Sequence, residues 1–145
     1  MRELDEKGML LVELVLVLFI AAALLFIPTI YTKQTKIHLE NQLFVEELQS
    51  QLTAIQNYAV LSVEVTAMIV SSQHKSIQFR VIDDEQNELN GVIYLPETVT
   101  TPTYKVYHFN AYSGNLRNFD TLVFFINNER HTMTFQLGSG RYKWQ

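Results

Sequence analysis

The chain has 145 residues, a formal net charge of -4 and no cysteine. This length provides for one domain, or for one small domain carried on a long helix, and it excludes an array of several domains. The charge excludes the strongly basic surface that drives sequence-independent binding to nucleic acid. Without cysteine, disulfides, thiolate metal sites and cysteine nucleophiles are excluded as well.

The most apolar part of the chain lies near its N-terminus. Residues 9–27 read MLLVELVLVLFIAAALLFI, and Glu13 is the only ionisable residue among these nineteen. With a rise of about 1.5 Å per residue, a helix of this length just spans the roughly 30 Å hydrocarbon core of a bilayer. The pattern therefore predicts a single membrane-spanning helix.

Two other interpretations of this apolar run stay open. A buried core helix is disfavoured because so short a chain cannot surround a helix that is apolar on all sides. A secretory signal cut near the alanines at 21–23 is disfavoured because the apolar run continues to residue 27, and because the leader MRELDEKG is acidic on balance.

Glu13 is the most informative residue of the run. A carboxylate at the centre of a bilayer costs about 2.5–3.5 kcal/mol, and less near the interface, so such residues usually have a partner. We therefore expect a cation beside Glu13. The alternative is that Glu13 lies close enough to the headgroups to stay solvated, since only four apolar residues precede it.

Residues 7–14, KGMLLVEL, resemble the class III signal of type IV pilins and pseudopilins. The similarity consists of a short charged leader ending in glycine, then a hydrophobic residue, then a glutamate five positions past the glycine. In that family a prepilin peptidase of the membrane cuts after the glycine on the cytoplasmic side and methylates the new terminal amine. The resemblance implies cleavage between Gly8 and Met9, and N-methylation of Met9.

The resemblance also implies a role in assembly for Glu13. Cleavage exposes an amine on Met9, and methylation keeps this amine cationic, so its natural complement is a carboxylate. The two groups lie four residues apart and could pair along one helix. The family model instead pairs the glutamate of one subunit with the amine of its neighbour, which would set the axial register of the packed helices.

A second helical stretch is predicted beyond the apolar run. Pro28 should kink or interrupt the helix, because it removes a hydrogen bond and crowds the preceding turn. Residues 31–62 then carry one apolar stripe at helical spacing, formed by Phe44, Leu48, Leu52, Ile55 and Ala59. We expect this stripe to pack on a sheet, and a free coiled coil is disfavoured because the stripe covers only about two heptads.

From residue 63 onward the period changes to that of β-strands. Strands are predicted at 67–70, 76–82, 91–94, 105–109, 122–126, 132–137 and 141–144, with a polar turn at 83–87, a hairpin loop at 127–130 and a tight turn at 138–140. The predicted fold is α+β and pilin-like, with a long N-terminal helix packed on a C-terminal antiparallel sheet. The predicted organisation is a cleaved leader (1–8), a transmembrane assembly helix (9–30), its amphipathic continuation (31–62) and a β-rich head (63–145).

No motif for catalysis, metal binding or cofactor binding is found in the sequence. The four histidines, His38, His74, His108 and His131, are widely spaced and form no HExxH pair. The acidic residues at 83–88 lack the glycine and the ligand spacing of a calcium loop, so a solvated turn is the favoured interpretation. We expect a protein that is not an enzyme and that uses no cofactor.

The C-terminal residues Arg141, Tyr142, Lys143 and Trp144 alternate cations with aromatic rings, as proteins that grip single-stranded DNA do. An ordinary half-buried strand explains the same pattern, because alternate residues of a strand point to opposite faces. We favour the strand, and a DNA contact has no other support.

The second half of the chain also resembles minor pilins of the competence pilus of low-GC Gram-positive bacteria. The similar segments are SIQF at 76–79, LP at 95–96 and FQLGSGRY at 135–142. This resemblance implies a subunit of the pilus that takes up external DNA in transformation. It would begin as a single-pass protein of the cell membrane, be matured by prepilin peptidase, and then join a major pilin and other minor pilins in an extracytoplasmic pilus at the cell surface.

Two alternative functions remain. The first is a pseudopilin of a type II secretion system. The second is a single-span membrane protein that presents a small β-rich binding domain and builds no filament.

Overall fold

The structure is a computed structural model that describes residues 2–102, 104–117, 120–136 and 141–145, with the backbone alone described at 2–7 and 25–32. The chain divides into two compact units, Met1–Leu39 and Glu40–Gln145. The first unit consists of helix, and the second contains the end of that helix and all the described strands.

Helix α1 extends from Arg2 to Leu61. The helix continues through Pro28, so the interruption expected there does not occur. The fixed φ of proline is compatible with a helix, and the single hydrogen bond it removes is outweighed by the intact bonds of the neighbouring turns. A kink at Pro28 stays a prediction.

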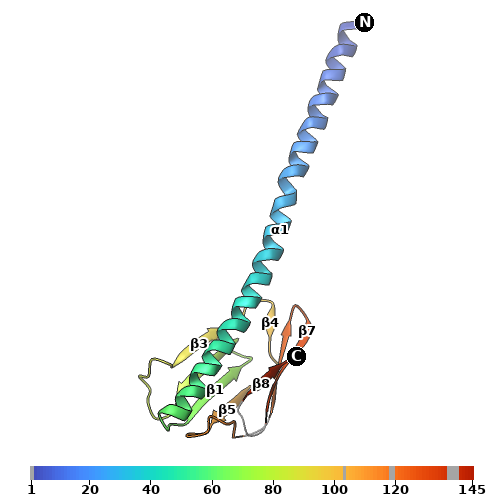
Figure 1. The fold of residues 1–145 in the computed structure, drawn as a ribbon. Helices are drawn as coiled ribbons and strands as arrows, with labels where there is room; N and C mark the ends of the chain where they lie inside the picture. Colours follow the sequence, from blue (N-terminus) through green and yellow to red (C-terminus); the bar gives the residue numbers. More distant parts are fainter. Residues whose placement is uncertain (1, 103, 118–119, 137–140) are drawn as a thin grey trace. The chain divides into compact units, whose positions relative to one another are not determined.

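The second unit, called the head below, holds eight strands among its described residues (Figure 1). They form two antiparallel sheets of four strands, in the orders β3-β2-β1-β5 and β4-β6-β7-β8. Their bounds are β1 Thr66–Ser71, β2 Ser76–Val81, β3 Gly91–Tyr94, β4 Val99–Thr100, β5 Lys105–Phe109, β6 Thr121–Ile126, β7 Glu129–Phe135 and β8 Tyr142–Trp144.

The α+β class and the helix-on-sheet architecture predicted from the sequence are confirmed. The strands differ from the prediction in forming two sheets and in including β4, which was not predicted. Because β4 has only two residues and follows Pro96, its alternation is too short to be recognised in the sequence. The tight turn expected at 138–140 lies outside the described residues.

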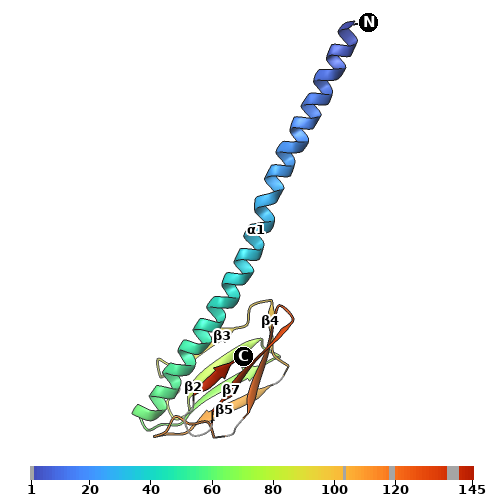
Figure 2. The same ribbon diagram turned by 45° about the vertical axis from the view of Figure 1, so that its right-hand side comes forward.

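The apolar stripe of α1 forms the centre of the head's core. All five predicted stripe residues are buried, with at most 3% of their surface exposed. The ring of Phe44 meets that of Phe124 of β6 edge-on, with 5.8 Å between the ring centres. The ring centres of Phe135 of β7 and Tyr107 of β5 lie 5.6 Å apart. The helix and both sheets therefore share one core, and Figures 1 and 2 show the last turns of α1 lying along the strands.

The hairpin between β6 and β7 corrects one prediction. The loop expected at 127–130 contains only Asn127 and Asn128, while Glu129 and Arg130 belong to β7. Both asparagines have positive φ angles, of 51° and 67°. A two-residue turn with this backbone matches the right-handed twist of the flanking strands, so β7 begins immediately after it.

The phenol of Tyr107 is an unusual member of the core. Only 3% of Tyr107 is exposed, and its oxygen has no hydrogen-bond partner in the described part of the chain. Burial raises the pKa of this phenol, and the negative charge of Asp120 raises it further. The neutral hydroxyl is therefore the form that the folded head accommodates.

We expect Tyr107→Phe to raise the free energy of unfolding by about 1 kcal/mol, because the substitution removes a buried polar group that lacks a partner. The difference in the free energy of unfolding between the variant and the natural chain should grow above about pH 10. There the phenol of the unfolded natural chain ionises, while that of the folded chain does not. Denaturant unfolding of both chains at pH 7 and pH 11 measures this. A variant less stable than the natural chain would show that the hydroxyl is satisfied.

Candidate assembly interface

The N-terminal unit presents apolar side chains on every side of its helix. From Met9 to Leu24, the large hydrophobic residues of α1 expose between 48% (Ile20) and 76% (Met9) of their surface. A helix that is apolar all round is stable only when protein or lipid surrounds it. Within the described part of the chain, no helical stretch is both long and apolar enough to cross a membrane. The predicted span at 9–27 includes residues whose side chains lie outside the described ones.

Glu13 lies within this apolar surface. Leu10 and Val17 share its face of α1, about one turn before and after it, and Leu14 lines the same shallow groove. Glu13 is exposed, and among the described side chains no ion pair involves its carboxylate. The carboxylate is thus surrounded by leucine and valine and has no described cation of its own chain to neutralise it.

Gly8 stands in α1 without a structural reason for being glycine. A β-carbon placed at Gly8 would meet no atom within 4 Å, and its backbone is helical. Glycine inside a helix costs roughly 1 kcal/mol relative to alanine. The residue therefore weakens the helix without any gain in packing or turn geometry, as expected for a position that another protein recognises.

The structure places Gly8, Met9 and Glu13 on one helix, with Met9 and Glu13 one turn apart. An amine at Met9 exists only after cleavage, so pairing between that amine and a carboxylate remains a prediction.

The C-terminal residues form an ordinary strand, as favoured from the sequence. In β8, Tyr142 and Trp144 are half-buried against the core, while Lys143 is exposed between them. The ring of Trp144 stacks on the rings of Phe124 and His131, with 5.7 Å and 6.0 Å between the ring centres. Packing therefore accounts for the aromatic residues of this segment.

We expect the double substitution Arg141→Gln and Lys143→Gln to change the affinity of the chain for single-stranded DNA by less than about twofold, because neither aromatic ring of β8 is free to stack on bases. Fluorescence anisotropy with a labelled oligonucleotide at low salt tests this. A large loss of affinity would instead establish a DNA contact at this edge.

The acidic loop between β2 and β3 has the hydrogen bonds of a structured turn. The carboxylate of Asp84 accepts bonds from the Gln86 amide at 3.1 Å and from Nδ2 of Asn87 at 3.0 Å. The side-chain oxygen of Asn90 accepts from the Val81 amide at 2.7 Å. Among the described residues, no group of three or more histidine or acidic side chains is arranged to hold a metal ion.

Sequence reasoning placed the end of α1 within one residue, but it missed the left-handed backbone that follows the helix. Val63, just past the helix, has a φ of 63°, and 42% of its surface is exposed. This is the position where a helix commonly ends in glycine, because a left-handed backbone crowds a β-carbon. The sequence carries no signal for this backbone, because valine stands where Gly or Asn is usual.

An α+β head whose core is completed by the amphipathic end of a long N-terminal helix defines the pilin-like fold. The structure is similar to that of the minor pseudopilin EpsH from the type 2 secretion system of Vibrio cholerae, with a TM-score of 0.57. The match covers 73% of this chain and 96% of that chain, at 15% sequence identity. At this identity the likeness shows that the two proteins share a fold. No family model and no curated protein matches the sequence.

Proposed function

We propose that the chain is a minor pilin, or pseudopilin, which is built into an extracytoplasmic filament through its N-terminal helix. The observation that carries this proposal is Glu13, a carboxylate on the exposed apolar surface of α1 that has no ion pair among the described side chains, on a chain whose head has the pilin-like fold. A carboxylate among apolar side chains needs a cation, and no described side chain of this helix supplies one, whereas a neighbouring subunit's terminal amine is a cation of suitable position.

In the proposed pathway the chain first resides in the cell membrane as a single-pass protein. Prepilin peptidase then cuts between Gly8 and Met9 and methylates Met9, after which the helix packs beside those of a major pilin and other minor pilins. The structurally unexplained glycine at position 8 supports this step.

At finer detail we propose a subunit of a competence-type type IV pilus, similar to the competence minor pilin usually called ComGD. Such a pilus serves uptake of external DNA in transformation, and the segments at 76–79, 95–96 and 135–142 support this assignment. A second candidate is a pseudopilin of a type II secretion system, which the structural likeness to EpsH favours. Deleting the gene separates the two: the first predicts lost transformation, and the second predicts lost secretion of folded proteins.

N-terminal sequencing of the chain purified from its own cells tests the proposal. A mature chain that begins with N-methylated Met9 supports it. A chain that retains Met1 would instead support a single-span membrane protein that builds no filament.

A further inference from the structure

The hairpin of β2 and β3 leaves a hollow in the surface of the head, because its two strands differ in length. β2 has six residues and β3 has four, and their pairing ends where Phe79 lies opposite Gly91. Arg80 and Val81 of β2 therefore extend past β3. A hollow of about 430 Å³ opens here, within the range of about 300–1,000 Å³ that small-molecule sites occupy. We call it the β2–β3 hollow, and its lining includes Gln78, Arg80, Ile82, Glu85, Asn90 and Val92.

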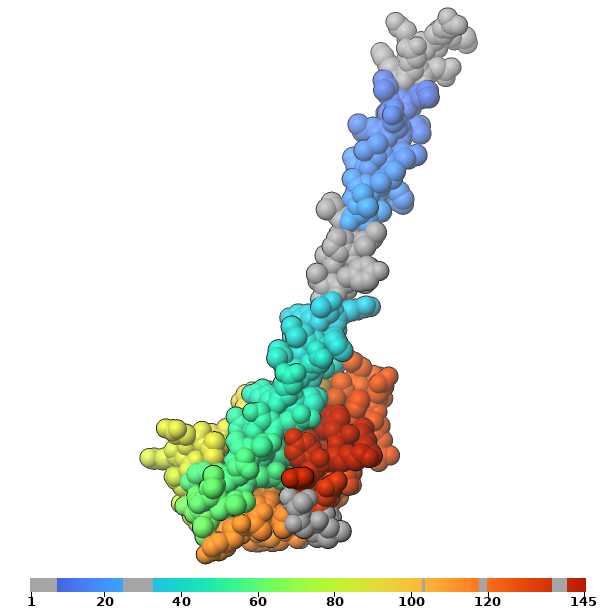
Figure 3. All heavy atoms as spheres, viewed as in Figure 1, coloured from blue at the N-terminus to red at the C-terminus, as the bar shows by residue number. Residues whose placement is uncertain are grey.

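The loop between the two strands forms a fixed wall of this hollow. The Val81 amide donates to Oδ1 of Asn90 at 2.7 Å, and Nδ2 of Asn90 donates to the Asp84 carbonyl at 2.8 Å. Nδ2 of Asn87 donates to the hydroxyl of Tyr58 on α1 at 2.8 Å. Figure 3 shows this loop, in yellow, beside the last turns of α1, in green. The wall therefore exists before a ligand arrives, which lowers the entropic cost of binding.

Two opposite charges line the hollow without being paired. The guanidinium of Arg80 has five N–H donors, and its one hydrogen bond among the described residues goes to Oε1 of Gln78 at a long 3.5 Å. The carboxylate of Glu85 makes no hydrogen bond or ion pair with any described residue. Both side chains are exposed. The hollow thus offers a group that binds carboxylates and a group that binds ammonium ions to a molecule from outside the chain.

Apolar surface accompanies these charges. Ile82 exposes 46% of its surface and Val92 exposes 47%, and both line the same hollow. An aliphatic group placed against them would gain about 25 cal/mol for each Å² of apolar surface that leaves water. A ligand that uses the whole lining therefore carries a carboxylate, an ammonium group and an aliphatic group.

We propose that the β2–β3 hollow binds a short aliphatic peptide whose two ends are free. Arg80 holds the terminal carboxylate through paired N–H donors, and Glu85 holds the terminal ammonium group. Ile82 and Val92 contact an aliphatic side chain of the peptide. A ligand with negative charge alone would be repelled by Glu85, and one with positive charge alone by Arg80. This inference does not depend on the proposed function, because it concerns the folded head.

Calorimetric titration of the full-length chain in detergent with leucyl-leucine tests the proposal, with detergent alone as the blank. We expect saturable binding. Blocking either end of the peptide, in N-acetyl-leucyl-leucine or in leucyl-leucine amide, should weaken it about fivefold or more, because one charged contact is lost. Glycylglycine has both ends but no side chains, so it should also bind more weakly. Absence of binding by leucyl-leucine, or equal affinity for any of the other three probes, would overturn the proposal.

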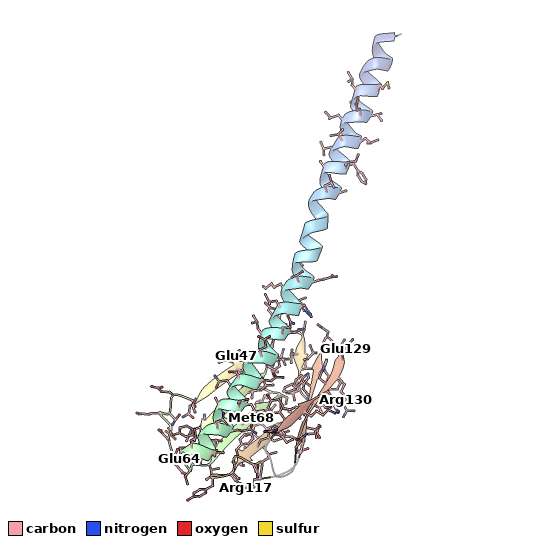
Figure 4. All side chains as sticks on the ribbon, in the orientation of Figure 1. Glu47, Glu64, Met68, Arg117, Glu129 and Arg130 are labelled. Atoms are coloured by element: carbon pink, nitrogen blue, oxygen red, sulfur yellow. The ribbon has the colours of Figure 1, made fainter. Side chains whose placement is uncertain are left out.

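Arg80→Gln and Glu85→Gln assign each end of the peptide to its partner. Arg80→Gln should remove the difference in affinity between leucyl-leucine and its amide, and Glu85→Gln should remove the difference between leucyl-leucine and its N-acetyl form. The controls are Arg130→Gln and Glu129→Gln, exposed residues of β7 in the other sheet (Figure 4), which should bind as the natural chain does. All four side chains are exposed, so the thermal midpoints should stay equal. A loss of affinity in the controls as large as that in the two hollow variants would contradict the proposal, and so would unchanged discrimination in both hollow variants.

Discussion

Glu13→Val should leave the chain inserted in the membrane and cut after Gly8, yet reduce its incorporation into filaments by about a hundredfold or more. Breaking a buried ion pair by removing one partner costs about 3–5 kcal/mol, because the remaining charge stays buried and uncompensated. Here the remaining charge would be the methylated amine of Met9 on the neighbouring subunit. Insertion itself should improve, because the substitution removes the one ionisable side chain of the apolar run.

The measurement compares membrane and sheared-filament fractions by immunoblotting. Glu46→Val is the matched control, since Glu46 is an exposed residue of the same helix within the head, and it should assemble as the natural chain does. Glu13→Gln keeps the shape and loses the charge, so it should fail in the same way as Glu13→Val. Normal assembly of either Glu13 variant would contradict the ion-pair model.

Gly8→Val should abolish maturation while leaving the folded chain intact. The β-carbon would meet no atom within 4 Å, and valine is a better helix former than glycine, so the helix should become slightly more stable. A peptidase that must approach the backbone of the scissile bond would, however, meet a branched side chain there. The loss of processing would therefore come from recognition and not from misfolding.

Intact-mass measurement of the membrane-extracted chain distinguishes the outcomes, because the uncut form retains residues 1–8. Glu13→Val serves as the control, since it should be cut as efficiently as the natural chain. Efficient cleavage of Gly8→Val at the same bond would show that the glycine is not what the peptidase recognises.

The buried stripe of α1 could be predicted because its signal is local. Spacings of three and four residues from Phe44 to Ala59 define one helix face, and that face is buried in the structure. Most strand bounds were predicted to within one or two residues for the same reason. The turn at 127 and 128 was predicted too long, although asparagine is one of the residues that favour the positive φ angles of a two-residue hairpin.

The division into two sheets could not be predicted, because it depends on pairings between distant segments. β1 pairs with β5, which begins at Lys105. β4 pairs with β6, although β5 lies between them in the chain and belongs to the other sheet. Alternation shows which residues share a face, but it does not show which strands are neighbours. The continuity of α1 through Pro28 was equally hidden, because an interior proline more commonly kinks or ends a helix than continues it.

Some features of the candidate site could be predicted from the sequence, and others could not. Gly8, Met9 and Glu13 were found because a short motif places them at fixed spacing. The left-handed backbone at Val63 and the face shared by Phe125 and Arg130 were not found, since the first is a backbone property and the second follows from strand register.

The core that α1 shares with both sheets has a consequence for the order in which the protein is made. Residues 41–59 leave the ribosome before any strand does, and they carry the apolar stripe on which the strands condense. Newly made strands would therefore pack against a helix that is already complete and would not have to collapse on one another. Shortening α1 from its C-terminal end should therefore leave those strands without their partner in the core and sensitive to proteases.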